Sequence, residues 1–143
     1  MRLEGRLHKD GKWWLAEIPI LDSTTQGRSK AEALEMAADL VETMVGREDF
    51  TATAHPVADR SFAVSGSEVG ALVATLLRRV RSRSGLTLAE VAKRLGQSSP
   101  NAYARYEQGT AVPTVEQLAR LLDAVGCELV LSETRAPIPE VTK

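Results

Sequence analysis

Small and polar side chains gather in residues 100–109 with a spacing that suits contact with the base edges of duplex DNA. Tyr103 and Tyr106 are three residues apart, so in a helix they share one face and can pack against a core. The other faces carry Asn101, Ala102, Ala104 and Arg105. Asn can pair with adenine and Arg with guanine through two hydrogen bonds each, and alanines let a helix approach the bases closely. This stretch is therefore predicted to read DNA, and a helix face that is simply solvated is the alternative.

The residues before this stretch can form a second helix that holds it in place. Thr87 and Glu90 fit a capping box, which satisfies free N–H groups at a helix start. Gly96 suits the left-handed residue that ends a helix, and Ser99 followed by Pro100 suits the N-cap and first position of the next one. The first helix would bury a single apolar stripe of Leu88, Val91, Ala92 and Leu95. Two short helices joined by a tight turn predict a helix-turn-helix unit.

Charge is distributed unevenly along the 143-residue chain, whose net charge is −1. Residues 1–66 hold eight Lys and Arg against eleven Asp and Glu, a net −3, whereas residues 67–143 hold ten against eight, a net +2. Seven basic residues and two acidic ones fall within residues 76–109, a net +5. The basic residues are Arg78, Arg79, Arg81, Arg83, Lys93, Arg94 and Arg105. This asymmetry favours an acidic unit followed by a nucleic-acid-binding unit, with chance clustering on a solvated helix as the alternative.

The composition argues against several other kinds of site. Hydrophobic residues make up 43% of the chain, enough to bury a core. The single cysteine, Cys127, cannot form an intramolecular disulfide, and with only His8 and His55 no metal-ligand cluster is visible. We therefore expect no metal and no cofactor. Neither a signal peptide nor an apolar run of about 18 residues is present, so we expect a cytoplasmic protein without a membrane segment.

The N-terminal residues 1–57 are predicted to form a β-β-β-α-β unit. Alternating apolar and polar residues predict strands at residues 2–8, 13–20, 21–26 and 50–56. Asp10 and Gly11 are typical of a hairpin turn. A helix is expected after a capping pair at residues 29–32, with its buried stripe at Leu34, Ala37, Ala38, Val41 and Val45. Residues 58–67 are interpreted as a linker, with the option of a short strand at residues 61–64.

The C-terminal residues 68–132 are predicted to form an all-α unit that ends in a short strand. A helix from residue 68 to about residue 84 precedes the helix-turn-helix, and another opens at Thr114 and ends at Gly126. The apolar run at residues 127–132 is predicted to be a strand. It would pair with the N-terminal sheet or with a second subunit, because an unpaired edge is a liability. Residues 133–143 are expected to be a flexible tail, and the fold class is α+β.

Two stretches of the chain resemble known families. Residues 76–131 are similar to the helix-turn-helix of the XRE/Cro family, through RSRSGLT at residues 81–87, EVAKRLG at 90–96 and RYEQG at 105–109. Residues 5–41 are similar to the N-terminal domain of HicB antitoxins, through DGKWWLAEIP at residues 10–19, TQG at 25–27 and EALEMA at 32–37. The combination, in this order, resembles HicB-type antitoxins.

This resemblance implies a fold, two partners and a set of contact residues. The N-terminal unit would have a partial RNase H-like fold without nuclease activity and would block a small basic RNA-cleaving toxin of the HicA type. The C-terminal unit would bind and repress the operator of its own operon, as a homodimer or tetramer. Base-reading positions fall on Asn101, Ala104 and Arg105, with Ala102 on the same helix, and phosphate contacts fall on Ser98 and Ser99. Lys93 adds a basic contact from the preceding helix, and Glu107 matches a position that is usually structural.

The surface that would meet the toxin is expected to include Trp13 together with the acidic residues Asp10, Glu17 and Asp22, which could steer a basic partner. Core packing of Trp13 and plain solvation of the carboxylates are the alternatives. A nuclease would need several carboxylates that hold two metal ions, and Glu4, Glu17, Asp10 and Asp22 form no dense set. A stand-alone repressor with a ligand-sensing N-terminal domain is the other reading that remains open.

Overall fold

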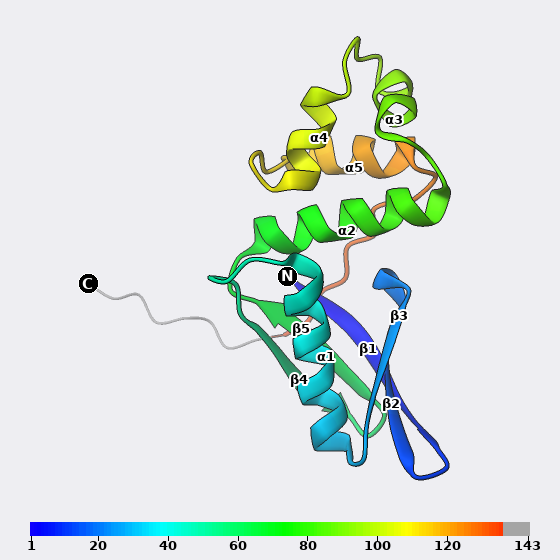
Figure 1. Cartoon of the computed structure of the whole chain (residues 1–143), viewed down its shortest axis with the longest axis vertical. Coiled ribbons are helices and arrows are strands. Elements are labelled where there is room, and N and C mark those ends of the chain that lie inside the picture. The colour runs from blue at the N-terminus through cyan, green and yellow to red at the C-terminus, as the bar shows by residue number, and fades with distance from the viewer. Residues whose placement is uncertain (136–143) are drawn as a thin grey trace, which may run out of the picture.

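The structure, a computed structural model, describes residues 1–135 and places a β-sheet unit against a cluster of helices (Figure 1). Its five-stranded sheet has the order β3-β2-β1-β5-β4 with every neighbouring pair antiparallel. The strands are β1 (Arg2–Asp10), β2 (Trp13–Ile18), β3 (Ser23–Gly27), β4 (Ala52–Ala58) and β5 (Ser61–Gly66). Helix α1 (Lys30–Val45) covers one face of this sheet.

The core of the sheet unit lies between α1 and the face of the sheet that carries Leu3, Leu7, Ile18 and Val64. Alternation along β1 sends Leu3, Gly5 and Leu7 to this face, as predicted. Gly5 pairs with Phe62 of β5, and a Cβ at Gly5 would collide with the Phe62 ring. The glycine thus makes room for the buried ring of Phe62.

The segment interpreted as a linker, residues 58–67, contains an inner strand of the sheet instead. Strand β5 pairs with β1 on one side and β4 on the other, and Phe62, Ala63 and Val64 are all buried. The short strand considered at residues 61–64 is therefore real and extends to Gly66. The segment is rich in Ser and Gly, a composition typical of linkers. Its burial depends on pairing with β1, about 60 positions earlier in the chain, which the local sequence does not reveal.

Helix α2 (Val69–Ser84) belongs to both halves of the protein. Ala71 and Leu72 pack into the sheet core, whereas Val73, Leu76, Leu77 and Val80 pack into a second core among the helices. Every residue from 71 to 77 is buried as a result. Val69 is 48% exposed because it begins the helix at the edge of both cores.

Two arginines of α2 join it to the sheet unit. Arg79 donates from Nε to the carbonyl of Leu21 (3.0 Å) and from Nη2 to the Ser23 hydroxyl (3.2 Å). Arg78 donates from Nη2 to the carbonyl of Met44 (3.1 Å), in the last turn of α1. Leu21 is the last residue of the 3₁₀ helix η1 (Pro19–Leu21). Carbonyls at a helix end lack partners within the helix, so α2 supplies cations where the dipole of each helix favours them.

Three further helices complete the second core: α3 (Leu88–Arg94), α4 (Asn101–Gln108) and α5 (Val115–Ala124). Tyr103, Leu121 and Leu122 are buried there with the apolar face of α2. Within the described residues, no helix is long and apolar enough to cross a membrane.

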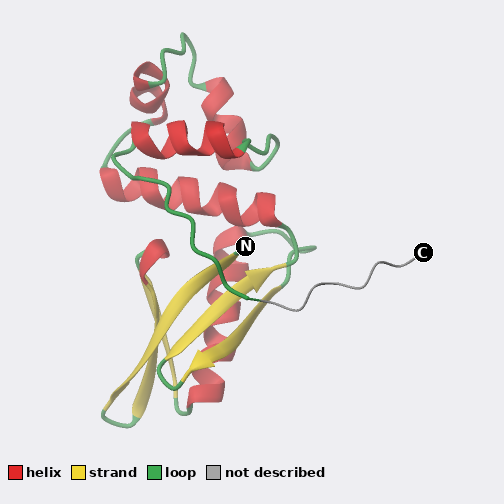
Figure 2. Ribbon diagram, turned by 180° about the vertical axis from the view of Figure 1, so that it is seen from behind, coloured by secondary structure: helices red, strands yellow, loops and turns green. Residues whose placement is uncertain are grey.

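The predicted strand at residues 127–132 is absent. This segment runs irregularly past the sheet face opposite α1 (Figure 2), and Val130 and Leu131 are 78% and 79% exposed. An apolar alternating run needs a neighbouring strand, and β1, β2 and β5 already have two partners each. Arg2 fixes the end of the segment by donating to the Thr134 hydroxyl (3.0 Å). Pairing with a second subunit stays a prediction, and most of the predicted tail at 133–143 lies outside the described residues.

Candidate nucleic-acid interface

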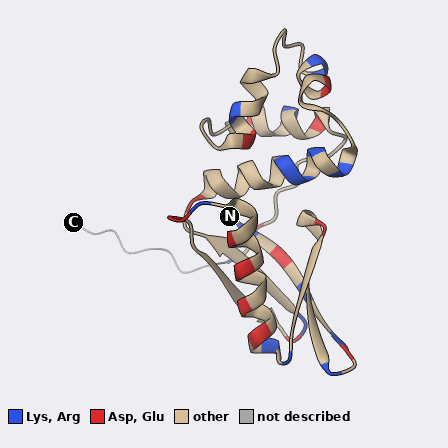
Figure 3. Ribbon diagram, in the orientation of Figure 1, with Lys and Arg blue, Asp and Glu red and all other residues tan. Residues whose placement is uncertain are grey.

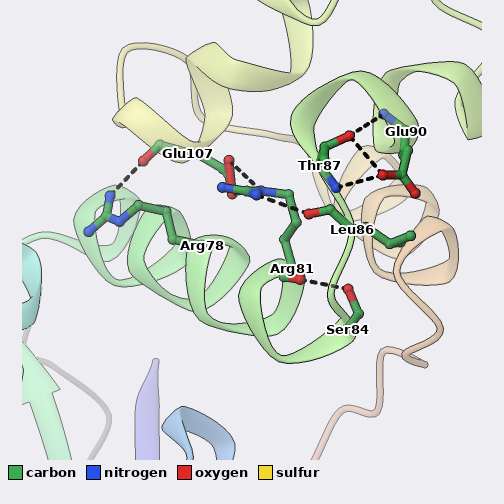
Figure 4. Close-up of polar contacts among 7 residues, drawn as sticks. All are labelled: Arg78, Arg81, Ser84, Leu86, Thr87, Glu90 and Glu107. Atoms are coloured by element: carbon green, nitrogen blue, oxygen red, sulfur yellow. Dashed lines mark hydrogen bonds and ion pairs between the residues drawn. The ribbon is translucent and has the colours of Figure 1, made fainter.

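Helix α3 begins where the sequence predicts it. The Thr87 hydroxyl accepts the N–H of Glu90 (3.1 Å), and the Glu90 carboxylate accepts the N–H of Thr87 (3.4 Å), which completes the capping box (Figure 4). Val91 and Ala92 are buried, and Leu88 and Leu95 pack at the border of the core. Gly96 adopts a φ of 73°, the left-handed conformation that a helix end favours.

Helix α4 begins within one residue of its predicted start. The Ser99 hydroxyl accepts the N–H of Asn101 (3.3 Å), and Pro100 already has helical angles and accepts the N–H of Ala104 (2.9 Å). Pro100 therefore occupies the N-cap position of a helix that starts at Asn101, one residue later than predicted, and the Ser99 hydroxyl satisfies the N–H of Asn101 from just outside it. The helix ends at Gly109, whose φ is 75°.

One face of α4 is open to solvent, and the opposite face is buried. Tyr103 and Glu107 are buried and Tyr106 is half-buried, so this side faces α2. Asn101, Ala102 and Arg105 are exposed, and Ala104 is half-buried between the two sides. Of the three predicted base-reading positions, the structure thus exposes Asn101 and Arg105, together with Ala102 on the same surface, and leaves Ala104 at its border.

A buried ion pair fixes the orientation of α4. Glu107, whose side chain is 6% exposed, accepts hydrogen bonds from Nε of Arg81 at 2.7 and 3.1 Å (Figure 4). Arg81 also donates to the carbonyl of Leu86 (3.1 Å), at the entry to α3. From one turn earlier on α2, Arg78 donates to the carbonyl of Glu107 (2.6 Å). The α2 arginines therefore hold both helices of the motif, and Glu107 has the structural role that the sequence suggests.

Tyr103 lies beside this ion pair with its ring fully buried. Its hydroxyl has no hydrogen-bond partner within the described residues. Burial, followed by the neighbouring charge of Glu107, raises the pKa of Tyr103 far above its ordinary value. The phenol therefore stays neutral and fills space in the core.

Most of the predicted basic cluster is structural. Arg78, Arg79 and Arg81 bond to the carbonyls and the carboxylate described above, and Arg94 donates to the carbonyl of Ala124 (3.1 Å). Figure 3 shows the basic residues concentrated on α2 and the acidic ones along α1. Three members remain exposed and without a side-chain hydrogen bond in residues 1–135: Arg83, Lys93 and Arg105. The net charge of this segment thus overstates the number of cations that are free to contact DNA.

The remaining predicted contacts lie around the start of α4. Ser98 is exposed in the turn, and Lys93 is exposed near the end of α3. Ser99 is half-buried, and its hydroxyl is already used for capping. Sequence reasoning missed Gln108, which is exposed and lies three residues after Arg105 and seven after Asn101. The helical period of the exposed face is the signal that could have found it.

The proposed toxin-contact residues are split between two ends of the sheet. Asp10 and Trp13 pair across the β1–β2 hairpin, and Glu17 lies further along β2 with Arg6 opposite. These three share the face away from α1. Asp22 lies at the other end, beyond η1, where its φ is 48°. The Trp13 ring has Lys12 and Arg28 at 5.8 and 5.7 Å, so its surroundings are more basic than expected.

The carboxylates considered for a nuclease are not gathered into a metal site. Among residues 1–135, no group of three His, Cys, Asp or Glu side chains is placed to hold a metal ion. Glu4 and Glu17 lie on the open face of the sheet, whereas Asp22 is beyond its end. Cys127 is a free thiol, half-buried beside the helical core.

Comparison with known proteins agrees with this geometry. Residues 72–134 match the family described as a helix-turn-helix domain. None of the curated proteins compared with the chain matches it. The match spans α2 to α5 and includes every predicted DNA contact. The C-terminal part of the chain is therefore a helix-turn-helix domain, a class of DNA-binding module, joined to an α+β unit with an antiparallel sheet.

Proposed function

We propose that this protein is an operator-binding repressor and, as its resemblance to HicB implies, the antitoxin of a small basic RNA-cleaving toxin. The observation that carries the DNA half is the two-sided character of α4. Tyr103 and Glu107 anchor one side, and Asn101, Ala102 and Arg105 stand free on the other. A helix held this rigidly can present an amide and a guanidinium to adjacent base pairs in the major groove.

The roles of the remaining contacts follow from their chemistry. Ser98 and Lys93 flank the start of α4 and would bind phosphates, which set register and orientation without reading sequence. Ser99 would offer its hydroxyl only after giving up its capping bond, so it serves mainly to fix the helix start. Ala102 and Ala104 would let the backbone come close to the duplex.

Replacement of Arg105 by Ala tests the DNA half. Loss of a bidentate contact to guanine should cost about 1–3 kcal/mol and relax the preference at one base position. Arg60→Ala is the matched control, because Arg60 is exposed in the β4–β5 turn and its replacement removes the same charge far from the motif. Fluorescence anisotropy with the DNA upstream of the coding sequence measures both variants. Equal affinity of Arg105→Ala and the unchanged chain would remove Arg105 from the readout.

The toxin half rests on the resemblance and on the form of the N-terminal unit. Helix α1 covers one face of the sheet, and the segment that follows α5 crosses the other face and is bonded to Arg2, at the start of β1 (Figure 2). Asp10 and Trp13 lie at the opposite end of β1 and β2, so within the described residues this end is open to a partner. The exposed side of α1 adds Glu32, Glu35 and Asp39, which would attract a cationic protein over a distance. The proposal includes a partial RNase H-like fold for this N-terminal unit, as the resemblance implies.

An RNA-cleavage assay tests the toxin half. The product of a short neighbouring reading frame that encodes a basic protein is purified, and its cleavage of RNA is followed with and without this chain. Stoichiometric inhibition that weakens in Trp13→Ala, but not in Val57→Ala on the far edge strand, supports the proposal. Cleavage that continues in a molar excess of the chain contradicts it.

A ligand-sensing repressor is the second candidate. A groove of about 340 Å³ between α1 and β4, lined by Leu34, Glu35, Ala38, Ala52 and Ala54 among others, favours it. A small molecule that changes operator affinity through this groove, together with failure of the toxin assay, would decide for this alternative.

A further inference from the structure

The two edges of the sheet differ in how open they are to another strand. Unprotected edge strands are templates for pairing with another chain, and proteins usually block them with charge, proline or bulges. Strand β4 is blocked in this way. The N–H of Ala52 donates to the Glu42 carboxylate (2.8 Å), Pro56 has no N–H to offer, and the pairing is irregular between Pro56 and Ala58.

Strand β3 carries none of these devices. Its sequence is Ser-Thr-Thr-Gln-Gly, without charge, proline or bulge, and it pairs with β2 along its whole length. Arg79 holds its first residue through the Ser23 hydroxyl. The strand is therefore held at its start, and no strand or helix of residues 1–135 covers its outer side, which is the flank of the sheet opposite β4 (Figures 1 and 2).

The backbone groups on that outer side can be assigned from the register. Gly11, with φ of 59°, makes a two-residue hairpin loop, so Asp10 and Trp13 form a hydrogen-bonded pair. Alternation then points the backbone of Trp14, Ala16 and Ile18 toward β3. Their partners on β3 are Gly27, Thr25 and Ser23. Thr24 and Gln26 are left with N–H and C=O groups directed away from the sheet.

The charges that flank β3 are self-complementary. Asp22 precedes the strand and Arg28 follows it, so the two lie at equal distances from Thr25. In an antiparallel pair of two β3 strands with a two-fold axis at Thr25, Thr24 faces Gln26 of the other copy, and the turn residue Asp22, whose φ is 48°, comes next to Arg28 of the other copy. Neither the Asp22 carboxylate nor the Arg28 guanidinium has an ion-pair partner in the described residues.

We propose that β3 is the interface with a second copy of this chain, through an antiparallel β3–β3 pair centred on Thr25. The register is the one in which the outward-pointing residues pair with each other and both charged ends find opposite charges. A shift of the axis to residue 24 or 26 keeps the backbone bonds and loses both ion pairs. The sheet then runs without interruption through both copies.

This arrangement leaves the helix-turn-helix domains independent of the interface. Helix α2 packs at the end of the sheet where β3 begins, through its contacts with η1. Because the paired strands are antiparallel, the two domains lie at opposite ends of the joined sheet. The proposal therefore does not rest on operator binding, and each domain stays free to meet DNA.

Proline substitution separates the two edges experimentally. Gln26→Pro removes an N–H that faces away from β2, so the strand keeps its partner in the sheet. Ala54→Pro is the matched control, because Ala54 is two residues after Ala52 and its N–H likewise faces outward on β4. Sedimentation velocity over a concentration series of the full chain gives the dimer dissociation constant. We expect Gln26→Pro to raise it about 10- to 100-fold, the effect of two lost hydrogen bonds of ordinary strength, and Ala54→Pro to leave it unchanged.

Charge reversal tests the register. Arg28→Asp and Lys12→Asp each remove a cation beside Trp13, but only Arg28 faces Asp22 in the proposed pair. Arg28→Asp should therefore weaken the dimer where Lys12→Asp does not, and the double variant Asp22→Lys with Arg28→Asp should restore it. Circular dichroism verifies that each variant is folded. A chain that stays monomeric at about 0.1 mM, which is about 100 times a micromolar dissociation constant, overturns the proposal. A dimer whose dissociation constant is unchanged in Gln26→Pro overturns it as well.

Discussion

The Arg81–Glu107 pair sets the stability of the helix-turn-helix domain and can be separated from DNA reading by mutation. Glu107→Ala removes a carboxylate that is 6% exposed and leaves Arg81, 24% exposed, without its counter-charge. Breaking a buried pair from one side costs about 3–5 kcal/mol. Arg81 keeps the Leu86 carbonyl and has some access to water, so we expect a loss nearer to about 2–4 kcal/mol.

The effect is large enough to read in a thermal scan. For a chain of this length, 1 kcal/mol corresponds to a shift of about 3 °C in Tm, so the variant should melt about 6–12 °C lower. Far-UV circular dichroism and urea titration measure the transition. Glu128→Ala, an exposed carboxylate in the same domain, is the charge-matched control and should stay within about 0.5 kcal/mol of the unchanged chain.

Arg105→Ala is the reciprocal variant. Its side chain is exposed and bonded to no other group in the described residues, so its Tm should not move while its operator affinity falls. Well below its melting temperature, Glu107→Ala should keep most of its operator affinity, because Arg78 still holds the end of α4.

Replacement of both partners tests the reasoning further. Arg81→Met with Glu107→Leu removes the charges together and fills the space, so it should recover most of the loss. If Glu107→Ala has the same Tm as the unchanged chain, the ion pair does not fix α4. If the double apolar variant is as unstable as Glu107→Ala, the stability comes from the hydrogen bonds themselves.

Three further predictions follow from the structure. Tyr103→Phe removes an unpaired buried hydroxyl and should be neutral or stabilising by about 0.5–1 kcal/mol in urea titration. Because the folded pKa of Tyr103 is raised, its stability contribution is complete below the unfolded value of about 10 and is lost at higher pH, so this variant should resist alkali better. Gly5→Ala should cost about 1–3 kcal/mol, measured the same way, because its methyl group meets the Phe62 ring. Anisotropy titrations at several salt concentrations should give a log–log slope of about −3 per domain if only the three unbonded cations of the cluster reach phosphates, rather than about −6 from all seven.

Local signals in the sequence predicted the helix-turn-helix well. The capping boxes at Thr87 and Thr114 are both complete, and the glycines that end α3 and α4 have left-handed φ values. Each of these depends on residues within one turn of each other, so the pattern along the chain contains the whole interaction. The exposed face of α4 follows from the same helical period.

The sequence did not predict what distant segments do to each other. The arginines of α2 look like a DNA-binding cluster, but their partners are carbonyls of Leu21, Met44 and Glu107, about 30 to 60 positions away. Strand β5 looks like a linker because its burial comes from β1 and β4. Residues 127–132 alternate like a strand, but they pair with no strand among residues 1–135. The two helices were predicted better than their setting, because each helix depends on nearby residues, whereas the arginine contacts that hold α4 come from a distant helix.

The use of arginines for structure has a consequence for how tightly one domain can bind DNA. Each cation that reaches a phosphate releases a counterion and so adds to the affinity for DNA. Arg78, Arg79 and Arg81 of α2 bond to groups inside the protein instead. The three unbonded cations of the cluster, Arg83, Lys93 and Arg105, supply a weak, salt-sensitive attraction, so most of the specific affinity of a single domain would come from α4. In the repressor proposed above, two domains on adjacent half-sites would supply the selectivity, because the second contact multiplies the affinity of the first without a larger interface. The same rigidity that fixes α4 on α2 makes this possible, since a helix held at both Glu107 and its N-cap keeps its spacing to a partner helix.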